Sequence, residues 1–172
     1  PGGGGRVAVY YDALSFPTDH IDVRAGQHSS YRAGDGTLFL KNATQEKGDL
    51  VIDGYGFSGA KDTAYIDALD NEFDNVIVKN GAVLNIEKPL RVRGKLSLLA
   101  GSVLTHRAEY EDGIEIFAND FEIDPTSLID VSGRGYRAGA GVCDGITLGG
   151  QFWAKSRSGG SYGGKGSIYD GP

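Results

Sequence analysis

Short runs of alternating apolar and polar residues, separated by turns, organise this chain. Each run is rich in Val, Ile, Leu and Tyr, which is the pattern of a half-buried β-strand. Turn-forming sequences such as AGDG and KNG separate the runs. Residues 65–73 are the one candidate for a helical turn, so the pattern predicts an all-β chain. Four clear runs are residues 6–12, 20–24, 37–41 and 49–53.

The middle of the chain repeats itself. Residues 76–86 (VIVKNGAVLNI), 96–106 (LSLLAGSVLTH) and 121–131 (FEIDPTSLIDV) align, with starts 20 and then 25 residues apart. One such unit cannot bury its apolar face alone, whereas stacked units bury a continuous core. The repeats therefore predict a right-handed parallel β-helix (β-solenoid), and a β-sandwich is the alternative. Asn80–Gly81 and Ala100–Gly101 are expected at the corners, where glycine adopts positive φ easily.

Four segments follow one another in a distinctive cyclic order: residues 128–136 (LIDVSGRGY), 159–166 (GGSYGGKG), 2–17 (GGGGRVAVYYDALSFP) and 36–42 (GTLFLKN). In that order they resemble a family of glycine-rich parallel β-helix repeats. These repeats occur in very large secreted or surface-anchored, adhesin-like bacterial proteins. The resemblance implies the β-helix architecture, an extracellular or cell-surface setting, and adjacent repeats of the same chain as partners. Residues 150–158 (GQFWAKSRS) interrupt what is usually a more uniform glycine tract.

Composition narrows the possible functions. With 172 residues and 40% hydrophobic residues, the chain is expected to form one module over residues 1–172. It begins with Pro and contains no Met, so we interpret it as part of a longer repeat-containing protein. The net charge of −6 argues against nucleic acid as a partner. No apolar run is long enough to span a bilayer, so membrane insertion is not expected.

One glycine-rich stretch comes close to a phosphate-binding loop. Residues 159–165 read GGSYGGK, but Gly166 stands where the loop requires Ser or Thr. Only a few residues follow, too few for the helix whose N-terminus would bind phosphate. A glycine loop that allows a tight backbone path is the better interpretation.

Acidic residues offer a candidate metal site rather than a catalytic one. Calcium binds several oxygen ligands, and acid-rich turns supply them, so Asp67, Asp70 and Asp74 are the candidate calcium ligands. No acid–base constellation stands out, which favours a binding or structural role over catalysis. No other cofactor is expected.

Aromatic residues near glycine or charge suggest carbohydrate contacts, since flat rings stack on sugars. Trp153 is the strongest candidate, with Gln151, Arg157 and Tyr162 as possible partners. The resemblance implies a structural or adhesive module of a large exported bacterial surface protein, and the aromatic residues predict that it binds polysaccharide or cell-surface glycan. A polysaccharide-active lyase or hydrolase, or a carbohydrate-binding module of an enzyme, is the alternative.

Overall fold

The computed structural model describes residues 1–28, 31–56, 71–108, 110 and 112–135. Within them the regular structure is β-strand apart from one short 3-10 turn, as the alternating pattern predicts. The elements are β1 (Arg6–Tyr11), η1 (Thr18–His20), β2 (Gln27–His28), β3 (Tyr31–Arg32), β4 (Thr37–Asn42), β5 (Asp49–Asp53), β6 (Glu72–Phe73), β7 (Asn75–Lys79), β8 (Val83–Asn85), β9 (Leu90–Leu98), β10 (Val103–Thr105), β11 (Ile116–Ile123) and β12 (Leu128–Ile129).

The chain divides into two compact units. The first comprises Pro1–Thr105 with Ile114–Asp130, and the second comprises His106–Gly113 with Val131–Pro172. All of the strands in the described residues belong to the first unit. In the second unit, the ring of Tyr110 lies 6.0 Å from the ring of His106 and 5.5 Å from the guanidinium carbon of Arg107.

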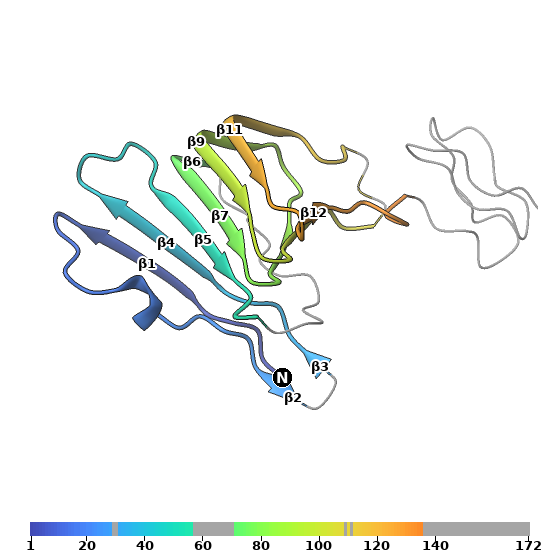
Figure 1. Cartoon of the computed structure of the whole chain (residues 1–172), viewed down its shortest axis with the longest axis horizontal. Helices are drawn as coiled ribbons and strands as arrows, with labels where there is room; N and C mark the ends of the chain where they lie inside the picture. Colours follow the sequence, from blue (N-terminus) through green and yellow to red (C-terminus); the bar gives the residue numbers. More distant parts are fainter. Residues whose placement is uncertain (29–30, 57–70, 109, 111, 136–172) are drawn as a thin grey trace, which may run out of the picture. The chain divides into compact units, whose positions relative to one another are not determined.

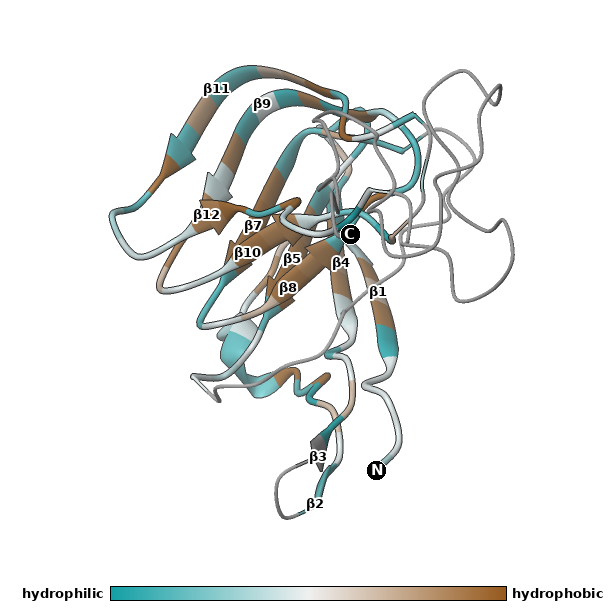
Figure 2. Cartoon of the chain, turned by 90° about the vertical axis from the view of Figure 1, so that its right-hand side faces the viewer, coloured by the Kyte–Doolittle hydropathy of each residue, from teal (hydrophilic) through white to brown (hydrophobic). Residues whose placement is uncertain are grey.

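Two main sheets build the first unit. The larger has seven strands in the order β1-β4-β5-β7-β9-β11, with β6 paired to β9 (Figure 1). The smaller has three strands in the order β12-β10-β8, which Figure 2 shows as a stack of short, strongly apolar strands. Strands β2 and β3 form a separate antiparallel pair.

The three sequence repeats pair with one another in parallel and in the register of their alignment. In the larger sheet, Val76 of β7 pairs with Leu96 of β9, which pairs in turn with Phe121 of β11. In the smaller sheet, Val103 of β10 lies between Val83 of β8 and Leu128 of β12. Equivalent positions of successive repeats therefore lie next to each other.

A continuous aliphatic core fills the space between these strands. One face of each strand is buried because side chains alternate along it. The core cluster draws on both main sheets and extends to partly buried side chains of β4 and β11. The fully buried aliphatic residues, with no exposed surface, are Ile52, Val76, Val78, Leu84, Leu90, Leu96, Leu98 and Leu104, and Ala82 is equally buried.

The turns between strands use the residues that the sequence marks as corners. Asn80 (φ 55°) and Ala100 (φ 53°) both adopt the left-handed conformation, and each is followed by a glycine with positive φ. The Gly81 N–H donates to the carbonyl of Ala100 at 2.9 Å. The two corners therefore lie next to each other. The Asp124 carboxylate of the third repeat in turn accepts a hydrogen bond from the Ala100 N–H.

The expected fold, a right-handed parallel β-helix (β-solenoid), is wrong, and so is the alternative β-sandwich. The seven-stranded sheet is mixed, because β4 and β5 pair antiparallel, with Phe39 opposite Leu50. Only six residues connect these strands, which suits a hairpin, whereas a parallel crossover needs about a dozen or more. A sandwich of this kind requires two antiparallel sheets, and the three-stranded sheet here is parallel throughout.

Two smaller predictions differ from the structure. Residues 20–24, expected as a strand, begin in the turn η1 and form no strand. Arg24 instead binds the Asp22 carboxylate through its Nε at 2.8 Å. Most of the candidate helical turn, residues 65–73, falls within residues 57–70, which lie outside the described residues. The last two residues of the candidate turn form strand β6.

The buried face of the central strands should dominate stability. We expect Val78→Ala, at a fully buried position, to lower the free energy of unfolding by roughly 1.5–3 kcal/mol, because buried methyl groups are lost and a cavity remains. Val51→Ala, on the half-buried face of β5, loses the same strand propensity and should cost under about 1 kcal/mol. Urea denaturation measures both, and equal losses would contradict this view of the core.

Candidate functional site

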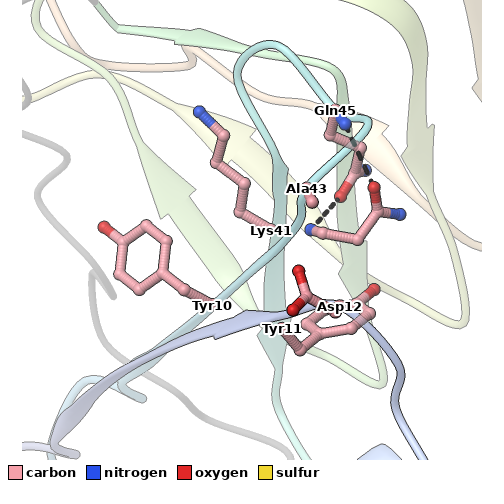
Figure 3. Close-up of a pocket in the computed structure, with 7 residues that line it drawn as sticks. Tyr10, Tyr11, Asp12, Lys41, Ala43 and Gln45 are labelled. Atoms are coloured by element: carbon pink, nitrogen blue, oxygen red, sulfur yellow. Dashed lines mark hydrogen bonds between the residues drawn. The ribbon is translucent and has the colours of Figure 1, made fainter.

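A pocket of about 380 Å³ lies where strands β1 and β4 end. The two strands are parallel, with Tyr10 paired to Lys41 and Tyr11 paired to Asn42. Because parallel strands end on the same side, their last residues and the turn after β4 converge. Figure 3 shows Tyr10 standing apart from Tyr11 and Asp12, with the turn that carries Ala43 and Gln45 above them. The lining residues are Tyr10, Tyr11, Asp12, Lys41, Asn42, Ala43 and Gln45.

The turn after β4 is held by its own side chains. Oδ1 of Asn42 accepts hydrogen bonds from the backbone N–H groups of Thr44 at 2.8 Å and Gln45 at 3.0 Å, and from the Thr44 hydroxyl at 2.6 Å. Oε1 of Gln45 accepts from the Asn42 N–H at 2.9 Å. Both amide oxygens are therefore engaged, which orients the two amide NH₂ groups as donors toward other partners.

Tyr10 places a flat aromatic surface at the mouth of the pocket. Its side chain is 72% exposed, although its ring centroid lies 5.8 Å from that of Phe39. Phe39 in turn contacts the buried Phe73, with ring centroids 6.4 Å apart. This row of three rings connects the exposed tyrosine to the core, so its position is defined while most of its surface stays open to solvent.

Charge in the pocket is balanced. The Lys41 ammonium donates to the backbone carbonyl of Glu46 at 2.8 Å, which holds the lysine along the turn. Among the described residues, no side chain or backbone group hydrogen-bonds or ion-pairs with the Asp12 carboxylate, which can accept from a ligand. The pocket thus combines an acceptor, amide donors and an ammonium group with an exposed ring.

The sequence-predicted glycan contacts lie outside the described residues. These are Gln151, Trp153, Arg157 and Tyr162, and Asp67 and Asp70 of the candidate calcium site lie outside as well. Binding of glycan or calcium by these residues stays a prediction.

Asp74, the third candidate calcium ligand, is described and serves the backbone. Its Oδ2 accepts from the N–H groups of Lys47 at 2.9 Å and Gly48 at 2.7 Å. Partial burial on its own would raise the pKa of Asp74, but the two N–H donors, with Arg93 and Lys41 nearby, outweigh it and lower that pKa. Within the described ranges, no group of three or more His, Cys, Asp or Glu residues is placed to hold a metal ion.

Sequence reasoning pointed to aromatic residues as carbohydrate contacts without singling out those of this pocket, and it missed the polar half of the pocket. Asp12 is distant along the chain from Asn42 and Gln45, and it meets them only because β1 pairs with β4. One local signal was present: Asn42 followed by Thr44 and Gln45 is typical of a side-chain-stabilised turn. That signal locates the turn, and the pairing of the strands locates the pocket.

Comparison of the chain with models of protein families, with curated proteins and with solved structures finds no match. None of the helical structure in the described part of the chain is long and apolar enough to cross a membrane.

The role of Asp74 predicts a specific dependence on pH. Its folded-state pKa is lowered, so the ionised carboxylate contributes stability that is present above the unfolded pKa, near 3.9. That contribution is lost as the pH falls through the lower folded-state value. We expect Asp74→Asn to be less stable than wild type at pH 7, and the difference to shrink as wild type is acidified.

Thermal unfolding of both proteins between pH 7 and pH 2 measures this difference. Asp12→Asn is the matched control, since the Asp12 carboxylate has no described partner and its loss should change stability little at any pH. A constant gap between wild type and Asp74→Asn over the whole range would contradict the assigned role.

Proposed function

We propose that this chain is a structural and adhesive module of a large exported bacterial surface protein, and that it binds glycan in the pocket between β1 and β4. The observation that carries this proposal is the exposed Tyr10 ring beside oriented polar groups. Rings of this kind stack on the apolar faces of sugars, and precisely placed polar groups then bind the hydroxyls.

The polar groups suit a polyhydroxylated ligand. A sugar hydroxyl both donates and accepts, so it can donate to the Asp12 carboxylate and accept from the amide groups of Asn42 and Gln45. One carboxylate and one ammonium in the lining leave the pocket close to neutral. This balance favours a neutral saccharide over a highly charged one.

The rest of the first unit supports a structural role. Apolar positions on the core face of the first two repeats lie in register and are fully buried, which makes this stack of strands a firm base for the pocket. Adjacent repeats of the same polypeptide are the proposed neighbours of the module, and the outside of the cell is the proposed setting.

A glycan-array screen of the chain tests the proposal. We expect saturable binding to at least one neutral glycan, and Tyr10→Ala should weaken it by roughly tenfold or more, equal to about 1.4 kcal/mol. The cause is loss of the stacking surface, while Phe39 and Phe73 remain in place. Phe16→Ala is the matched control, because Phe16 is an exposed aromatic residue outside the pocket.

Other outcomes would redirect the proposal. A blank array for a folded protein would leave only the structural role. Binding that a chelator abolishes would assign the site to the candidate calcium ligands. Release of soluble products from a bound polymer would favour the polysaccharide-active enzyme.

A further inference from the structure

Asn42 is the one asparagine in the sequence that has Ser or Thr two positions later without Pro between them, since residues 42–44 read NAT. Asn-X-Ser/Thr is the acceptor sequence for N-linked glycosylation, and it functions on a surface loop of an exported protein. Because the motif is short, the structure of the turn decides whether Asn42 can accept a sugar.

The turn that carries the motif is accessible. Asn42 is the last residue of β4, and Ala43 and Thr44 after it are exposed. The Ala43 N–H donates to the carbonyl of Tyr11 at 3.1 Å, and in the described part of the chain residues 43–46 pair with no strand. A modifying enzyme can therefore contact the motif without opening the sheet.

Thr44 prepares the Asn42 side chain for this reaction. Glycosylation replaces one proton of the Asn42 Nδ2 group with a sugar, and negative charge develops on the amide as that proton leaves. The Thr44 hydroxyl donates to Oδ1 of the same amide at 2.6 Å, and the Thr44 N–H donates to it at 2.8 Å. Two donors on this oxygen stabilise the developing charge, as in an oxyanion hole.

The Nδ2 group of Asn42 is also free to react, which sets it apart from most other asparagines of the chain. It has no hydrogen-bond partner among the described residues. In contrast, Nδ2 of Asn75 holds two strands together by donating to Oδ1 of Asp49 at 2.8 Å. The same group donates to an oxygen elsewhere in the fold in Asn71, Asn80 and Asn119.

We propose that Asn42 is an N-glycosylation site of this chain. The sugar comes from a donor in which its anomeric carbon is bonded to a diphosphate, either a nucleotide sugar or a polyprenyl-diphosphate oligosaccharide. The bond between the anomeric carbon and the phosphate oxygen breaks, the leaving diphosphate takes the electron pair, and Nδ2 of Asn42 bonds to the carbon. The proton from Nδ2 passes to a carboxylate of the transferase.

The modification also regulates the pocket. Asn42 lines the pocket together with the exposed Tyr10. A sugar attached to Asn42 occupies space that a soluble glycan needs, and it replaces one N–H donor of the amide. The glycosylated chain therefore binds soluble glycan more weakly. This consequence rests on the proposed glycan site, whereas the modification itself does not.

Mass spectrometry of the full chain, isolated from the cells that naturally produce it, tests the proposal. Trypsin cleaves after Lys41 and Lys47 and yields residues 42–47 (NATQEK) as one peptide. We expect this peptide to carry a sugar on Asn42, localised by electron-transfer fragmentation. Asn42→Gln and Thr44→Val, produced in the same cells, should lose the sugar. Thr44→Ser is the matched control, because it keeps the hydroxyl and should keep the sugar.

Circular dichroism confirms that the variants are folded. A single sugar on Asn42 identifies a nucleotide sugar as the donor, an oligosaccharide identifies a polyprenyl diphosphate, and either result supports the proposal. A peptide without sugar overturns it. A sugar on the Thr44 hydroxyl instead of Asn42 overturns it too, as does a sugar that Thr44→Val retains.

Glycan-array binding separates this test from that of the pocket. The chain produced in cells without the transferase carries no sugar, and it should bind glycan roughly tenfold or more tightly than the glycosylated chain. Equal binding by the two forms overturns the regulatory role. If neither form binds, the glycan-binding proposal fails, while a sugar on Asn42 still supports the modification site.

Discussion

Contact between fully buried aliphatic side chains of successive repeats is the interaction on which the rest of the structure depends. Val76 lies against Leu96, Val78 against Leu98 and Leu84 against Leu104, and none of these residues is exposed. A shift of one residue in any of these strands would turn its apolar side chains away from the core. The register of the strands, and with it the position of every turn, follows from this constraint.

The reversal between β4 and β5 places the candidate site beside this regular stack. Because Phe39 pairs opposite Leu50, it lies on the face of the sheet that continues the core. Strand β1 then pairs in parallel with β4 and carries Tyr10 on the same face, next to Phe39. Strands β1 and β4 end next to each other at the edge of the core, where an aromatic ring and polar side chains line the same pocket. The departure from a uniform parallel fold is therefore what creates the candidate site.

Local patterns in the sequence predicted the elements well and their arrangement only in part. Alternation located β1, β4 and β5. The repeat alignment matched the register from Val76 to Leu96, since units with the same apolar pattern bury their apolar faces together. The direction of β4 relative to β5 was missed, although the short connection between them contained the information. The pocket could not be predicted, because Tyr11 and Asn42 are 31 residues apart and meet only through strand pairing. Trp153, the residue favoured by sequence, lies outside the described residues.

The central claim is that glycan binds where β1 and β4 end. Chemical-shift mapping of the ¹⁵N-labelled chain, titrated with the best glycan from an array, tests it most directly because it reports on every assigned amide at once. The account predicts saturable shifts concentrated in residues 10–12 and 42–45, with β7 and β9 unaffected. Shifts concentrated in residues 151–162 instead, with the ends of β1 and β4 unchanged, would contradict it.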